Sequence, residues 1–156
     1  MAINPTHVRE VIIQPVLKEH GLWSVEAEEL LMMTAAQESK MGWYIIQVDN
    51  DKLLYNNALS MWQIEWATFD WLQSKFPQFI AGRKFEELAH DMRLAALVAR
   101  LRYYVVAEAL PAVTEDGYLL KLARYYKKYY NTPLGAATID ETLRNYRRYV
   151  QERQGQ

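Results

Sequence analysis

The chain has 156 residues, of which 51% are hydrophobic and 24% are charged, so we expect one globular domain with its own core and not a disordered protein. Its 18 basic and 19 acidic residues give a formal net charge of -1, which argues against a nucleic acid as the main partner because there is no overall positive field. The absence of cysteine excludes disulfides, zinc–thiolate centres and a thiol nucleophile.

The first part of the chain does not have the pattern of a targeting segment. Residues 1–20 contain basic and acidic side chains such as Arg9 and Glu19, and they lack the uninterrupted apolar core of a signal peptide. No later stretch reaches membrane-spanning length. We therefore expect synthesis as a soluble cytoplasmic chain, with a single domain over residues 1–150 and a polar tail over 151–156.

Two helices joined by a short loop are predicted at the start of the chain. Asn4 before Pro5 places a cap and a first-turn proline in their favoured positions, and Gly21 ends this first helix. Ser24 is the cap candidate for the second helix, which is predicted to start at Val25.

The second helix carries the main candidate for catalysis, Glu38. At helical spacing this carboxylate continues an apolar stripe made of Ala27, Leu30, Leu31, Thr34 and Ala35. We expect it to face inward or into a cleft, whereas Glu26, Glu28 and Glu29 can face water. Gly42 fits the helix terminus, which puts Glu38 beside unpaired carbonyls in the last turn. Burial and this negative potential favour the protonated form that a general acid needs. The alternative is an ordinary solvated charge at a helix end.

Residues 42–64 lose the helical period and predict a mostly irregular segment with at most one small hairpin, formed around residues 43–48 and a turn at 49–52. Their content of Trp, Tyr, Asn and Asp is typical of a binding loop. Asp49 and Asp51 are candidates for a second carboxylate, although plain turn residues are the favoured interpretation. They lack the fuller oxygen-ligand pattern of a calcium loop.

The rest of the chain is predicted to be helical, over residues 65–76, 92–111, 116–130 and 138–150. In the first of these helices Trp66, Phe69 and Leu72 are expected along one side. The segment after Asp91 is apolar over much of its circumference and is predicted to be the central buried helix. Glu108 extends its stripe and is a rival to Glu38, with pairing to a nearby lysine or arginine as the favoured interpretation.

An aromatic and basic surface is predicted near the end of the chain, and its members are Tyr125, Tyr126, Lys127, Lys128, Tyr129 and Tyr130. Together with Arg147 and Arg148 it would suit a nucleic acid strand, which stacks on aromatic rings and follows positive charge. A core face beside a solvated flank is the favoured interpretation. Thr138 with Glu141 predicts the cap of the final helix.

Three short segments resemble the lysozyme-like, soluble-lytic-transglycosylase type of glycan-cleaving domain, and most closely the small transglycosylase-like proteins encoded in bacteriophage genomes. They are residues 34–39 (TAAQES), residues 58–64 (ALSMWQI) and residues 129–132 (YYNT). The family has an acid in a Glu-Ser pair at a helix end, followed by an Ala-x-Gly-x-x-Gln stretch that lines the cleft. Glu65 and Thr68 also match the pattern after the glutamine. The resemblance covers roughly residues 11–149, and the order and spacing of the motifs carry it.

The resemblance implies a mainly α, lysozyme-like fold and cleavage of peptidoglycan glycan strands, with Glu38 as general acid and base. It implies that the substrate is bound by Ser60, Trp62, Gln63, Tyr130 and Asn131, where Tyr130 and Asn131 orient Glu38 or the acetamido group of the sugar. We expect neither a metal ion nor a cofactor. The implied context is synthesis in the cytoplasm of a bacterial host without a signal peptide, association with the virion, and action in the periplasm or cell wall.

Three positions depart from the family pattern. Lys40 and Ser60 stand where the family has glycine, and Trp66 stands where it commonly has proline. The alternative reading is therefore a catalytically inactive virion component that keeps the fold and contacts other phage proteins.

Overall fold

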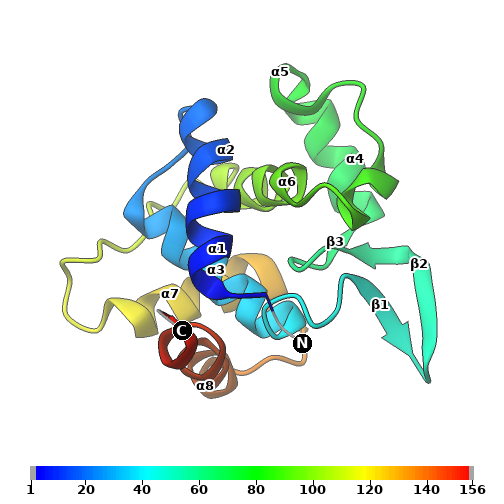
Figure 1. Cartoon of the computed structure of the whole chain (residues 1–156). Coiled ribbons are helices and arrows are strands. Elements are labelled where there is room, and N and C mark those ends of the chain that lie inside the picture. Colours follow the sequence, from blue (N-terminus) through cyan, green and yellow to red (C-terminus); the bar gives the residue numbers. More distant parts are fainter. Residues whose placement is uncertain (1–2, 155–156) are drawn as a thin grey trace.

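A computed structural model describes residues 3–154, in which helices make up most of the regular structure (Figure 1). The helices are α1 (Pro5–His7), η1 (Val8–Ile13), α2 (Gln14–Glu19), α3 (Val25–Ser39), α4 (Trp66–Lys75), α5 (Pro77–Ile80), η2 (Phe85–Ala89), α6 (Met92–Tyr104), α7 (Tyr118–Tyr126), η3 (Lys127–Asn131), α8 (Ile139–Tyr149) and η4 (Gln151–Arg153). The strands are β1 (Ile46–Asp49), β2 (Lys52–Leu59) and β3 (Ile64–Glu65), which pair antiparallel in the order β1-β2-β3. The predicted class, mainly helical with a small hairpin after the Glu38 helix, is confirmed.

The first helical stretch runs through α1, η1 and α2 and contains a wide π-helical turn. The Asn4 side chain caps it by accepting a hydrogen bond from the backbone N–H of Thr6 at 2.8 Å, as predicted. Pro15 has no N–H to donate, and in a regular helix its ring would clash with the carbonyl of Val11. The carbonyl of Val11 instead accepts a hydrogen bond from Nε of Arg93 at 3.2 Å, which ties this stretch to α6.

Helix α6 lies in the middle of the molecule, as predicted for a helix that is apolar over much of its circumference (Figure 1). It packs against α2, α3 and α4, while α3 also contacts α7 and α8. The core therefore forms where α3 and α6 cross, with the small sheet at one edge of the molecule (Figure 1). This arrangement leaves the last turn of α3 facing the space between the sheet and the helices.

Helix α3 begins as predicted but ends differently. The Ser24 hydroxyl accepts a hydrogen bond from the N–H of Ala27 at 3.0 Å and caps its start. Its end is made by Lys40, which has φ +52° in the left-handed region, and Met41 and Gly42 follow with φ +59° and +81°. The glycine expected at the terminus is thus the third of three residues with positive φ, because the chain keeps turning before it enters the sheet.

The acidic residues near the start of α3 correct a prediction, because Glu28 and Glu29 do not face water. Nη1 of the buried Arg9 lies 3.1 Å from Glu28 and 2.6 Å from Glu29. Nε1 of Trp23 donates to Glu28 at 2.7 Å, and the hydroxyl of Tyr146 donates to Glu29. A buried cation thus holds both carboxylates between the first and the last helices of the chain.

The sheet has one strand more than the single hairpin that the sequence predicts. Asn50 and Asp51 form the β1–β2 turn with φ +48° and +64°, which asparagine and aspartate tolerate better than other non-glycine residues. Asp49 pairs with Lys52 at the same tip. Asp51 is therefore a turn residue, as the favoured interpretation holds, and Asp49 ends the strand just before the turn; both are exposed, and neither lines a hollow beside Glu38.

Two later helices differ from their predictions. Helix α6 ends at Tyr104 and does not reach Pro111, because Val105, Val106 and Leu110 leave the helical path and pack on the core. Trp66 is exposed at the start of α4 and does not join the buried side of that helix.

The rival acid Glu108 lies outside any helix and is exposed. It lies 3.2 Å from Nζ of Lys128 and accepts a hydrogen bond from the hydroxyl of Tyr129. The expected pairing of this carboxylate is therefore confirmed, although its predicted place on a helical stripe is wrong.

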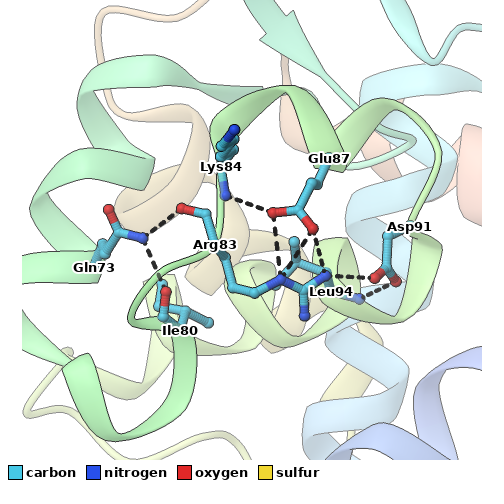
Figure 2. Close-up of polar contacts among 7 residues, drawn as sticks. All are labelled: Gln73, Ile80, Arg83, Lys84, Glu87, Asp91 and Leu94. Atoms are coloured by element: carbon cyan, nitrogen blue, oxygen red, sulfur yellow. Dashed lines mark hydrogen bonds and ion pairs between the residues drawn. The ribbon is translucent and has the colours of Figure 1, made fainter.

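A polar cluster fastens the connection between α4 and α6 (Figure 2). Nε2 of Gln73 donates to the carbonyls of Ile80 and Arg83 at 2.9 and 2.7 Å, and Nη2 of Arg83 lies 2.7 Å from Asp91 and 3.0 Å from Glu87. The carboxylate of Asp91 also caps α6 by accepting the N–H of Leu94 at 2.9 Å. The cluster thereby links α4 to the start of α6, and both helices contribute to the site described below.

Residues 151–154 of the expected polar tail belong to the described part of the chain. Residues Gln151–Arg153 form the 3-10 turn η4, and the guanidinium of Arg153 lies 5.0 Å from the ring centre of Tyr149. Residues 155–156 of the predicted tail lie outside the described part of the chain.

Candidate active site

Glu38 lies in the last turn of α3, half-buried, at the junction of two hollows. The first, which we call the Arg102 hollow, has a volume of about 340 Å³ and is lined by Glu38, Gln63, Ile64, Glu65, Thr68, Arg102, Tyr130, Asn131 and Thr132. The second, the Tyr44 hollow, has about 280 Å³ and is lined by Glu38, Tyr44, Gln47 and Gln63. The two hollows share Glu38 and Gln63, so the carboxylate has open space on both sides.

A third hollow continues this space along the sheet. The Asn56 hollow has a volume of about 390 Å³ and is lined by Gln47, Asn56, Asn57, Glu65, Trp66 and Ala67. It shares Gln47 with the Tyr44 hollow and Glu65 with the Arg102 hollow. The three together form a groove between the sheet and the helices, and we call it the Glu38 groove.

Burial raises the pKa of Glu38 to about 7, because the ionised carboxylate loses solvation in this position. The hydroxyl of Tyr126 donates a hydrogen bond to Oε1 of Glu38 at 2.5 Å and by itself lowers the pKa. The negative charge of Glu65 raises it again. Burial prevails, so the pKa of Glu38 lies near neutral pH and both of its protonation states are accessible there. The predicted burial of this acid is present in the structure, whereas the negative charge that raises its pKa belongs to Glu65 and not to the carbonyls of the helix end.

Tyr126 belongs to a stack of tyrosines that forms the floor beside Glu38. Its ring centre lies 6.0 Å from that of Tyr130, which in turn lies 5.2 Å from that of Tyr103. The hydroxyl of Tyr130 donates to the carbonyl of Trp62 at 2.6 Å. Tyr126, and not Tyr130, therefore holds the Glu38 carboxylate. Tyr130 lines the Arg102 hollow and fixes the turn that carries Gln63.

The turn from Ser60 to Gln63 shapes the opposite wall. Nε2 of Gln63 donates to the carbonyl of Ser60 at 2.8 Å, which directs the half-buried glutamine toward the two hollows that it lines. Ser60 is buried with φ +73°, and its hydroxyl accepts the N–H of Trp62 at 3.1 Å. Ser60 therefore builds the turn, and the side chain that it positions, Gln63, faces the groove.

Trp62 requires a correction as a substrate-binding residue. Its side chain is 0% exposed, and its Nε1 donates to the carbonyl of Leu31 at 3.0 Å. The indole therefore anchors the turn to α3 from below and does not face the groove. Asn131 does line the Arg102 hollow, where its Oδ1 accepts a hydrogen bond from Nζ of Lys127 at 2.8 Å.

Tyr126, Glu65 and Arg102 were not among the expected site residues: Tyr126 is buried and bonds Glu38 from behind the groove, and the other two line the Arg102 hollow. Tyr126 shares a helical face with Tyr130, so spacing alone does not say which hydroxyl reaches Glu38. Glu65 follows closely after Gln63, and this proximity was the available signal for a second carboxylate. Arg102 is a charged position near the end of the central helix, most of whose residues are buried, and a partly buried charge of this kind often marks a site.

Among residues 3–154, no group of three or more His, Asp or Glu side chains is placed to hold a metal ion. None of the helices in that range has the length and apolar character needed to cross a membrane.

Comparisons with known proteins add no family assignment. No family model, no curated protein and no solved structure matches this chain.

Proposed function

We propose that this protein cleaves the glycan strands of peptidoglycan, with Glu38 as the general acid and base. The observation that carries the proposal is a carboxyl with a pKa of about 7 at the junction of adjoining hollows. A general acid works best when its pKa lies near the pH at which it acts, and here burial supplies that pKa.

The reaction begins with proton transfer from Glu38 to the oxygen that links N-acetylmuramic acid to N-acetylglucosamine. As that bond breaks, the N-acetyl group of the substrate stabilises the positive carbon. The Glu38 carboxylate then takes a proton from the muramyl 6-hydroxyl, which gives a 1,6-anhydro sugar, or from water, which gives hydrolysis. Tyr126 assists the first step, because its hydrogen bond stabilises the carboxylate that forms when Glu38 gives up its proton.

Glu65 has two effects in this scheme. Its charge helps to keep Glu38 protonated before the reaction. It also lines the same hollow as Glu38, where a second carboxylate can polarise a water molecule and favour hydrolysis over the anhydro product.

The walls of the groove suit a sugar chain. The Asn56 hollow combines the exposed indole of Trp66 with the amides of Gln47, Asn56 and Asn57. Indole rings offer flat apolar faces on which pyranose rings stack, and amides both donate and accept hydrogen bonds to hydroxyl and acetamido groups.

The backbone at two positions agrees with the family resemblance. Lys40 and Ser60 stand where the resembling family has glycine, and their φ angles are +52° and +73°. Glycine adopts such angles without a steric cost, whereas other residues do so rarely. Backbone angles that favour glycine at these two positions support the proposal.

The test compares wild type with Glu38→Gln on purified cell-wall sacculi, and Glu108→Gln serves as a control that removes an exposed acid outside the groove. Mass spectrometry of the released muropeptides separates anhydro from reducing ends. We expect release by wild type and Glu108→Gln and at least a hundredfold slower release by Glu38→Gln. Equal release by all three proteins would remove Glu38 from the mechanism.

A second candidate is a virion component that keeps the groove but does not turn over substrate. Large apolar side chains on and beside the sheet favour it, since Trp43, Ile45, Leu53 and Tyr55 are 42–59% exposed. An antibody against the protein would find it in purified particles, and wild type would then release no muropeptides. Absence from particles together with release from sacculi would reject this candidate.

A further inference from the structure

Arg102 occupies an unusual place for a cation. It lies near the end of α6, between the buried residues Leu101 and Tyr103, and it is itself half-buried. Its side chain lines the same hollow as Glu38, Glu65 and the amide of Asn131. The central helix of the fold thus contributes a basic residue to the lining of the groove, and its charge acts on the neighbouring Tyr130.

No carboxylate within residues 3–154 forms an ion pair with this guanidinium, for which the limit is an N···O distance of 4.0 Å. The guanidinium lies near the ring of Trp71, whose centre is 5.9 Å from Cζ. Arg9 and Arg83 are both held by two carboxylates. Arg102 therefore has hydrogen-bond donors available to a ligand in the groove.

The charge of Arg102 is not used to keep the catalytic acid ionised. The pKa of Glu38 is raised by burial and by Glu65, and the opposing effect comes from Tyr126. When Glu38 is protonated, Glu65 and Arg102 remain as opposite charges on the wall of the hollow. An anionic substituent of a ligand can then enter on the side of Arg102, where its desolvation is compensated.

We propose that Arg102 binds the lactyl group of N-acetylmuramic acid and thereby selects strands that contain this sugar over chitin. This inference rests on the proposed function. Muramic acid differs from glucosamine by a lactyl ether at O3, which ends in a carboxylate in a peptide-free strand and in an amide carbonyl where a stem peptide is attached. Chitin lacks the group altogether.

The chemistry of the guanidinium predicts an order among these ligands. A carboxylate accepts two parallel N–H···O bonds from arginine, whereas an amide carbonyl accepts weaker, uncharged ones. Peptide-free muramyl strands therefore bind most tightly, peptide-bearing strands less tightly, and chitin most weakly. The neutral amides and the indole of the Asn56 hollow suit the unsubstituted N-acetylglucosamine unit in all three.

The test measures binding by calorimetry on the Glu38→Gln background, so that turnover does not consume the ligand. The probes are a peptide-free muramyl tetrasaccharide, the same tetrasaccharide with stem peptides, and chitotetraose. Adding Arg102→Gln should weaken binding of the peptide-free ligand by about tenfold to a hundredfold and leave chitotetraose within about twofold. Arg102→Lys should retain part of the affinity, because it keeps the charge but not the planar fork. Arg124→Gln, which lies in a separate hollow, is the control.

The outcomes separate this inference from the proposed function. Equal weakening for all three ligands by Arg102→Gln would make Arg102 a structural cation and would overturn the inference. Unchanged discrimination with normal muropeptide release by wild type would overturn the inference and leave the proposed function standing. If wild type releases nothing and none of the ligands binds, both are wrong. Thermal unfolding of each variant shows whether the fold is retained.

Discussion

Tyr126→Phe removes one hydroxyl, and with it the hydrogen bond to Glu38, while the ring stays in the tyrosine stack. The bond is short, at 2.5 Å, and its acceptor is the carboxylate. A hydrogen bond to a charged group contributes about 1.5–3 kcal/mol, and one unit of pKa corresponds to about 1.4 kcal/mol. Part of the hydrogen-bond energy is lost from both protonation states, because the protonated acid also accepts a hydrogen bond, and only the difference between the two losses shifts the pKa. We therefore expect the pKa of Glu38 to rise by about one unit above its value of about 7.

The assay is the pH dependence of kcat/KM for muropeptide release, which reports the free enzyme. Wild type should lose activity as pH rises through about 7, where Glu38 loses its proton. For Tyr126→Phe, kcat/KM should decline at a pH about one unit higher than in wild type. Its value on the low-pH plateau should be about tenfold lower, because the carboxylate that forms lacks the hydrogen bond from the Tyr126 hydroxyl. Tyr129→Phe, which removes a hydroxyl bonded to the exposed Glu108, should match wild type. Superimposable wild-type and Tyr126→Phe profiles would refute the role assigned to Tyr126.

Other predictions concern stability. The pKa of Glu38 is higher in the folded protein than its ordinary value of 4.5, so the folded state binds this proton more tightly than the unfolded state. The stability that the bound proton provides is complete below pH 4.5 and is lost as the pH rises to 7. Between pH 4.5 and pH 8, the free energy of unfolding of Glu38→Gln in urea should therefore rise by about 3 kcal/mol relative to that of wild type. If the two free energies change with pH in parallel, the acid is not buried. Arg9→Leu leaves Glu28 and Glu29 buried without their cation and should lower the free energy of unfolding at pH 7 by about 3–5 kcal/mol, whereas a loss below about 1 kcal/mol would show that water reaches them. Lys40→Gly should stabilise the protein by about 0.5–1 kcal/mol because it removes a side chain from a left-handed backbone, and destabilisation would be the opposite result.

The parts of the fold that local chemistry controls could be predicted from the sequence. Asn4 and Ser24 cap their helices through bonds to backbone N–H groups only two and three residues away. Thr138 does the same for α8 by accepting the N–H of Glu141 at 3.2 Å. The inward direction of Glu38 follows from helical spacing along one stripe. Such features depend on a single element and survive its packing.

The features that were missed depend on contacts between distant segments. The sequence around Glu28 does not indicate that Arg9, in the preceding helix, bonds its carboxylate. This contact is why the expectation of a solvated carboxylate is wrong. The end of α6 at Tyr104 is decided by how residues 105–110 pack on the core, which outweighs their helical period. The choice of Tyr126 over Tyr130 as the partner of Glu38 depends on the angle between α3 and α7. Helical spacing within α7 carries no information about that angle.

The central claim is that Glu38 keeps its proton near neutral pH in a groove that admits a sugar chain. The most direct measurement is a titration of the Glu38 side-chain carboxyl carbon by ¹³C NMR, assigned by comparison with Glu38→Gln. We predict a midpoint near pH 7, well above the ordinary value of 4.5 for glutamate. A midpoint near 4.5 would mean that the carboxylate is solvated and ionised at neutral pH, and it would contradict both its burial and its role as the acid.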